Sequence, residues 1–116
     1  MKMIVAIIRP ERLEAVQKAL NEQDVYLMTV SDVRGCGRQR GYTEVYRERE
    51  IQIRLLPKLK LEIAVNDAFV EATVEAIVHA ARTPETGQIG DGKIFVLSLE
   101  DCVRIRTGER GEIAIG

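Results

Sequence analysis

The stretch KLKLEIAVNDAFVEATVEAIVHAA, residues 58–81, changes its hydrophobic period partway along. Over residues 58–65 apolar and mostly charged side chains alternate, which is typical of a strand with one buried face. Over residues 70–81 apolar side chains return every three or four positions, which indicates a helix with one apolar stripe. The stripe consists of Val70, Val74, Ile77, Val78 and Ala81. Asn66 or Asp67 is expected to cap this helix, so the stretch predicts a strand followed by a helix.

The first part of the chain has the same order. Residues 3–8, MIVAII, form an apolar run rich in β-branched side chains, which predicts a central strand buried on both faces. Pro10 is suited to the first turn of a helix, and residues 11–23 carry one apolar stripe. Residues 26–33 then predict a second strand.

A further apolar strand at residues 93–99 completes a strand–helix–strand order that occurs twice. Two such units with right-handed crossovers predict one α+β domain of the ferredoxin-like type over residues 1–116. Residues 37–55, between the second and third strands, are a long charged loop of the kind that is functional or mobile. The glycine-rich tail, residues 108–116, is expected to be mobile. Two helices cover only one sheet face, and self-association would cover the other.

Composition narrows the class of protein. The 116 residues suit one domain, and a net charge of -1 argues against bulk binding to nucleic acid or to an anionic membrane. The two cysteines, Cys36 and Cys102, form no CxxC pattern and are expected to be reduced thiols. The chain shows no signal peptide or membrane-spanning run, so we expect a cytoplasmic location.

The sharpest local motif is TGQIGDGKIF, residues 86–95. Gly90 and Gly92 flank Asp91 and allow a tight turn whose backbone N–H groups can face an anion. Lys93 adds a positive charge at the same place. The same residues would also suit an ordinary glycine turn before a strand, in which Asp91 is a turn residue rather than a general base.

Two other basic features suit phosphate or carboxylate groups. Arg104 and Arg106 lie two positions apart in a short alternating segment, so on a strand they would point to one face and suit a polyphosphate. A solvated strand face is the alternative. GCGRQRG, residues 35–41, leads into the long loop, and Lys58 lies at the loop's far end. A flexible solvated loop is the alternative there.

Four segments together carry a resemblance to a known family. They are GRQRGYTEVYRERE (37–50), LPKLKLEI (56–63), TGQIGDGKIFV (86–96) and VRIRTGE (103–109). In this order the chain resembles the PII nitrogen-regulatory signal proteins over nearly its whole length. The resemblance implies a homotrimer of ferredoxin-like subunits that binds ATP or ADP in the clefts between subunits. It also implies that 2-oxoglutarate binds when Mg-ATP is present.

The resemblance assigns roles by position. It implies nucleotide contacts from Thr29, Gly37, Arg38, Glu62, Gly90, Asp91, Gly92, Lys93, Arg104 and Arg106. It implies 2-oxoglutarate contacts from Gln39, Gly41 and Lys58, with Gln39 also touching the Mg²⁺. Tyr46 and Arg47 fall in the partner-binding loop. The implied partners are an ammonium transporter or a nitrogen-assimilation enzyme, so the protein would meet a membrane only through a transporter.

The sequence departs from the family pattern at named positions. Ile51 stands where some members carry a uridylylated tyrosine, and Arg49 where others carry a phosphorylated serine. Pro84, Glu85 and their neighbours form a short insertion before the phosphate loop. Tyr42 stands where many members have histidine.

Three functions other than a 2-oxoglutarate sensor are possible for such a chain. A PII-like sensor of another adenine nucleotide would have no need of both Gln39 and Lys58. A phosphoryl-transfer enzyme would need an acid–base pair or a metal-binding carboxylate cluster, and the sequence shows neither. An RNA-binding module would need stacked sheet aromatics, and the few aromatic residues do not form such a platform. The sequence therefore favours a non-enzymatic sensor.

Overall fold

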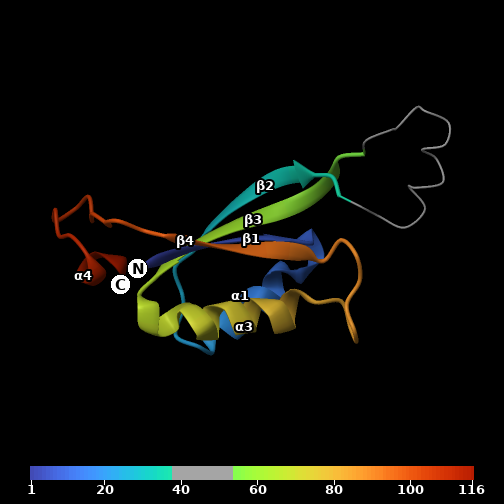
Figure 1. The fold of residues 1–116 in the computed structure, drawn as a ribbon, viewed down its shortest axis with the longest axis horizontal. Coiled ribbons are helices and arrows are strands. Elements are labelled where there is room, and N and C mark those ends of the chain that lie inside the picture. The colour runs from blue at the N-terminus through green and yellow to red at the C-terminus, as the bar shows by residue number, and fades with distance from the viewer. Residues whose placement is uncertain (38–53) are drawn as a thin grey trace.

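The computed structural model describes residues 1–37 and 54–116 of the chain. One antiparallel sheet in the order β2-β3-β1-β4 carries two main helices on a single face (Figure 1). The strands are β1 (Lys2–Ile8), β2 (Thr29–Gly35), β3 (Leu56–Val65) and β4 (Gly92–Ser98). The helical segments are η1 (Pro10–Arg12), α1 (Leu13–Asn21), η3 (Asp67–Phe69), α3 (Val70–Ala81) and α4 (Glu112–Ile115). The predicted ferredoxin-like α+β fold is confirmed.

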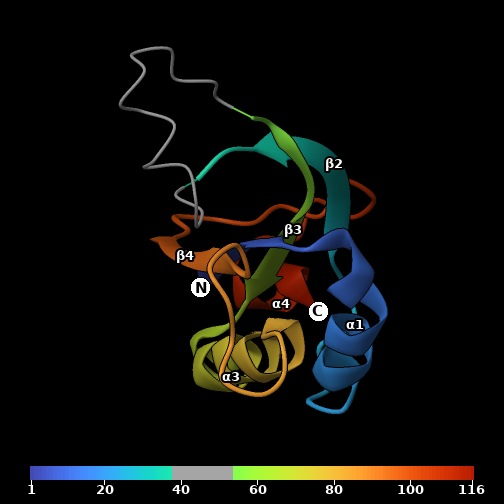
Figure 2. The same cartoon turned by 90° about the vertical axis from the view of Figure 1, so that its right-hand side faces the viewer.

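The core lies between the sheet and the pair of helices. Figure 2 shows α1 and α3 side by side against the same face of the sheet. Alternate residues of the two central strands are buried there: Ile4, Ala6 and Ile8 of β1, and Leu59, Leu61, Ile63 and Val65 of β3. Thr73 is the one polar residue buried with them in the described part of the chain. Its hydroxyl donates to the Phe69 carbonyl at 2.7 Å, so the group is satisfied.

The other face of the sheet is open in a single chain. Met3, Val5 and Ile7 of β1 lie on it and remain half-buried. The prediction that β1 is buried on both faces is therefore wrong for one chain, because no described element covers this side. Successive strand residues point to opposite faces, so the same run that fills the core also presents apolar side chains here.

The second strand begins later than predicted, at Thr29 rather than at residue 26. Directly after α1, the Val25 N–H donates to the Leu20 carbonyl at 3.0 Å, which satisfies a carbonyl at the C-terminal end of the helix. Asp24 turns the chain with a φ of 61°. Pairing starts only where Thr29 meets Glu62 of β3, so the residues from 26 to 28 connect the helix to the sheet.

The start of α3 also differs from the expectation. Neither Asn66 nor Asp67 makes a side-chain cap bond. The Asp67 carboxylate instead accepts from the α-amino group of Met1 at 2.7 Å, and this hydrogen bond lowers the pKa of Asp67. Val78, expected in the apolar stripe, is partly exposed, and Thr73 takes a buried place on that helix.

The segment of residues 103–107 is not a strand, apart from an isolated bridge between Val103 and Arg110. The Gly108 N–H donates to the Arg104 carbonyl at 2.7 Å, and the Arg104 N–H donates to the Glu109 carbonyl at 2.9 Å. These bonds reverse the chain, so the expectation that Arg104 and Arg106 share one strand face is wrong. The tail beyond, for which the sequence predicts mobility, contains α4. Among the described residues no helix has the length and apolar character to cross a membrane.

Candidate functional site

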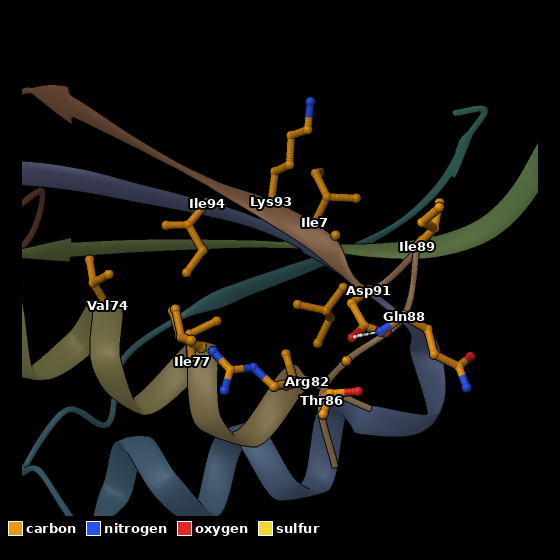
Figure 3. A pocket seen from close by; sticks show the side chains of 15 residues that line it. Ile7, Val74, Ile77, Arg82, Thr86, Gln88, Ile89, Asp91, Lys93 and Ile94 are labelled. Atoms are coloured by element: carbon orange, nitrogen blue, oxygen red, sulfur yellow. Dashed lines mark hydrogen bonds between the residues drawn. The ribbon is translucent and has the colours of Figure 1, made fainter. Parts of the chain in front are cut away.

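A groove of about 640 Å³ lies at the end of the sheet where β4 begins. The end of β1, the second half of α3 and the loop that enters β4 form its walls. Figure 3 shows Val74 and Ile77 of α3 on one side of the strands, and Lys93 and Ile7 pointing away from that helix. The groove therefore bends around the beginning of an edge strand, with apolar side chains below and a lysine above.

The loop is pressed directly against β1 at Gly92. This glycine has a φ of +113°, and a Cβ placed on it would lie 1.7 Å from the Ile7 carbonyl oxygen. No residue with a side chain can occupy that space without moving the backbone of β1. Gly90 and Gly87 also have positive φ values, 103° and 88°. The glycines of the motif thus serve both the turn and a close approach to the neighbouring strand.

Asp91 holds the loop together from inside. Its carboxylate accepts from Arg9 Nε at 2.9 Å, from the Thr83 N–H at 2.9 Å and from the Gln88 N–H at 3.0 Å. The Thr83 hydroxyl also donates to it. Burial raises the pKa of Asp91, but the hydrogen bonds from Thr83, Gln88 and Arg9 outweigh that effect and hold the pKa well below its usual value. Asp91 is therefore a charged turn residue whose acceptors are occupied within the loop.

Lysines gather on the open face beside this loop. Lys58 Nζ donates to the Gly90 carbonyl at 2.6 Å. Burial, followed by the positive charge of Arg9, lowers the pKa of Lys58. Lys60 and Lys93 are the two register partners of Ile7, so all three side chains stand in one row across the sheet. This end of the open face combines a glycine loop with several positive charges, which suits an anion.

Thr29 and Glu62 lie in the next row of the same face. They are register partners on β2 and β3, and Val5 of β1 is the partner of Glu62 on its other side. The structure thus brings together two residues far apart in sequence to which the resemblance assigns neighbouring roles.

Arg104 and Arg106 do not join this group within one chain. They follow β4, whose seven residues span about 20 Å from the glycine loop to the opposite end of the sheet. Figure 1 shows the segment around α4 at the far end of the molecule from the loop that enters β4. A site using both Lys93 and Arg104 therefore needs more than one copy of the chain.

Several of the predicted site residues lie outside the described part of the chain: Arg38, Gln39, Gly41, Tyr46 and Arg47. Gly37 is the last described residue before them and is exposed.

The sequence reasoning missed Arg9 and Thr83, which fix Asp91, and Ile7, whose carbonyl meets Gly92. A signal for Arg9 existed, because the ferredoxin-like order pairs the end of the first strand with the start of the fourth. Arg9 also donates to the Ile89 carbonyl at 3.2 Å, so it is bonded to the loop at two points. No sequence pattern pointed to Thr83, because it lies in the irregular connection between α3 and β4, outside the regular pairing of strands.

Comparison with known proteins gives the family. The family described as "Nitrogen regulatory protein P-II" matches residues 1–109. The chain belongs to this family. Nitrogen regulatory protein P-II 2 of Methanothermobacter thermautotrophicus is 56% identical over 115 residues, covering 99% of this chain and 97% of the relative. Nitrogen regulatory protein GlnK1 of Methanosarcina mazei is 53% identical over 115 residues, again covering 99% of this chain and 97% of the relative. Nitrogen regulatory protein P-II of Rhodospirillum rubrum is 51% identical, covering 99% of this chain and all of the relative.

The first prediction concerns the loop that enters β4, which packs against β1 at Gly92. Gly92→Ala should lower the free energy of unfolding by about 3 kcal/mol or more, because backbone strain adds to a clash with the Ile7 carbonyl. Gly108→Ala is the matched control, since Gly108 has a φ of +76° but open space around it. It should lose only about 1 kcal/mol, from strain alone. Urea unfolding of both variants measures the difference. Equal losses would show that contact with β1 does not restrict residue 92.

Proposed function

We propose that the protein is a non-enzymatic cytoplasmic signal protein that binds ATP or ADP, responds to 2-oxoglutarate, and controls nitrogen-metabolism targets. The observation that carries the proposal is the row of lysines beside the glycine loop. Lys58 touches the Gly90 carbonyl, while Lys60 and Lys93 flank Ile7 on the same face. Backbone N–H groups of a glycine turn with nearby lysines form a common type of phosphate site.

The size and chemistry of the groove support a nucleotide. Its volume, about 640 Å³, lies within the roughly 300–1,000 Å³ typical of small-molecule sites. Its isoleucine-rich side suits an apolar group, and its lysine side suits phosphates. Among residues 1–37 and 54–116 there is no group of three His, Cys, Asp or Glu side chains that could hold a metal. As the family resemblance implies, Mg²⁺ is proposed to arrive as Mg-ATP, with Gln39 as its protein contact.

The placement of Lys93 at the start of β4 and of Arg104 beyond its end supports a site shared between subunits. Each chain would give its glycine loop to one nucleotide, and its Arg104 and Arg106 to a nucleotide held by a neighbour. The open sheet face, with Val5 and Phe95 adjacent in one row, offers an apolar surface for assembly. We therefore propose a homotrimer, as the resemblance implies.

Partner control is proposed to act through residues 37–55, with Tyr46 and Arg47 contacting an ammonium transporter or a nitrogen-assimilation enzyme. Ile51 has no hydroxyl group, so a nucleotidyl group cannot be attached at the position used in some family members. Ligand occupancy, rather than modification at that position, is then the switch. Lys58 supports this, because it joins the base of the loop to the phosphate loop.

The proposed assembly can be measured by analytical ultracentrifugation. The protein should sediment with three times the chain mass of 13.0 kDa. Val5→Glu, which places a charge on the open face, should disrupt the assembly because a buried unpaired charge is costly. Gln17→Glu, which adds the same charge on exposed α1, should leave it intact. A parent protein that remains a monomer at micromolar concentration would contradict the shared site.

Nucleotide binding is tested by Lys93→Ala. Loss of a charged hydrogen bond to phosphate is expected to cost about 1.5–3 kcal/mol, or roughly tenfold to a hundredfold in ATP affinity. Lys18→Ala on the exposed side of α1 removes the same charge far from the groove and should bind ATP as the parent does. Isothermal titration calorimetry measures the ATP dissociation constant of each variant. An unchanged affinity in Lys93→Ala would place the phosphates elsewhere.

The 2-oxoglutarate response is tested by Lys58→Met. A dianion beside a triphosphate is repelled unless Mg²⁺ and a lysine lie between them, so the variant should lose 2-oxoglutarate binding and keep ADP binding. The measurement is calorimetry with 2-oxoglutarate alone, and with Mg-ATP present. Tight binding without nucleotide would contradict the mechanism. A parent that binds ATP and ignores 2-oxoglutarate would instead be a sensor of another adenine nucleotide.

A further inference from the structure

The Arg104 side chain is bonded to the C-terminal segment, residues 109–116. Its Nη1 donates to the Glu109 carboxylate. Its Nη2 donates to the carbonyls of Ile113 at 2.9 Å and Gly116 at 3.1 Å. Thr107 donates its hydroxyl to the same Glu109 carboxylate at 2.9 Å. The two terminal nitrogens of the guanidinium therefore both have acceptors within the segment.

The C-terminal segment is also attached to the body of the protein without Arg104. Asn66 Nδ2 donates to the Glu112 carbonyl at 3.2 Å, and Ala114 is buried. The segment thus has a fixed place from which it can hold the arginine. Arg106 differs, since it is exposed and makes no ion pair or side-chain hydrogen bond with any residue of 1–37 and 54–116.

Phosphate and the C-terminal segment compete for the same donors. A guanidinium binds phosphate through paired N–H groups, and in Arg104 the Nη1 and Nη2 groups already face a carboxylate and two carbonyls. The Glu109 carboxylate would also repel a phosphate placed beside it. Each paired edge of the guanidinium includes one N–H of Nη2, and both of these already donate to carbonyls. A phosphate can therefore take a paired contact with Arg104 only after bonds to residues 109–116 are broken.

We propose that residues 109–116 are an autoinhibitory segment that holds Arg104 away from ligand, and that nucleotide phosphates must displace them. This rests on the proposed function, in which Arg104 serves a nucleotide held by a neighbouring subunit. The apparent affinity for ATP is then reduced by the fraction of Arg104 that remains held. Ligand binding in turn frees the Glu109 carboxylate and the Ile113 and Gly116 carbonyls from Arg104, because a paired phosphate contact and these bonds exclude each other.

The first test compares Glu109→Gln with Glu112→Gln by ATP calorimetry. Both variants remove one negative charge from the same segment, but only Glu109 pairs with Arg104 in the described structure. An exposed or half-exposed ion pair contributes little, so Glu109→Gln should bind ATP about twofold to fivefold tighter than the parent. Glu112→Gln should match the parent. Equal affinities of all three proteins overturn the proposal.

The second test repeats Glu109→Gln in an Arg104→Ala background. The gain in affinity should disappear there, because Glu109 then has no arginine to hold. A gain that persists without Arg104 shows a general charge effect and overturns the proposal. Thermal unfolding of each variant checks that the fold is retained.

The third measurement follows the segment itself in the parent protein. Addition of saturating ATP should shift the amide NMR signals of Ile113 and Gly116 toward their positions in Arg104→Ala, in which the bonds between Arg104 and the segment are absent. Unchanged signals in a protein that binds ATP overturn the autoinhibitory segment and leave the proposed function standing. A parent that binds no ATP contradicts both proposals.

Discussion

The contact between Gly92 and the end of β1 determines how the site is built. Because Gly92 has no Cβ, its backbone can lie against the Ile7 carbonyl, where any side chain would collide. This brings the loop before β4 next to the residue that follows β1, and Arg9 can then bond to Asp91 at 2.9 Å. The same packing sends Lys93 to the open face beside Ile7. The close approach of the Gly92 backbone to β1 therefore determines the position of the loop, of the Arg9–Asp91 ion pair and of Lys93 on the open face.

The charges of the site divide into an inner and an outer set. Asp91 is compensated by Arg9 and by the donors of its own loop, so it leaves little negative charge to oppose a ligand. Lys58 donates to a neutral carbonyl, that of Gly90, rather than to a carboxylate. Lys93 forms no ion pair with any residue in the described part of the chain. The result is a loop that is stable by itself and a face that remains positive toward an anion.

Residue patterns predicted the elements of the fold more reliably than their ends. The alternation in residues 58–65 identified β3, yet the strand starts at Leu56 and includes Pro57. A proline fits there because β1 pairs with β3 only as far as Leu59, so Pro57 needs no N–H on that side. The segment around Arg104 was misjudged for a different reason. Its alternation is typical of a strand, whereas a turn at Gly108 folds it back on itself.

For the site, the glycine motif and Lys58 could be found from the sequence, since each has a recognisable residue type in a recognisable place. The hydrogen bonds of Asp91 could not, because Arg9 and Thr83 meet it only after the sheet has formed. The bonding of Arg104 to the C-terminal carbonyls was equally hidden, as carbonyl acceptors exist at every residue. Backbone partners carry no sequence signature, so they limit what a motif alone can reveal.

The length of β4 links ligand binding to assembly. This strand spans about 20 Å from the glycine loop to the end of the sheet that Arg104 follows, so in the proposed site one subunit does not apply both groups to one triphosphate. A ligand that contacts both groups binds the assembled protein more tightly than the free chain, and by linkage it must stabilise the assembly to the same extent. In the proposed inhibition, residues 109–116 add a second energetic cost, because a subunit that gives Arg104 to a neighbour must first break its own bonds between Arg104 and that segment. In the proposed assembly the binding energy of each site depends on two chains, so ligand binding at one subunit is coupled to the packing of its neighbour.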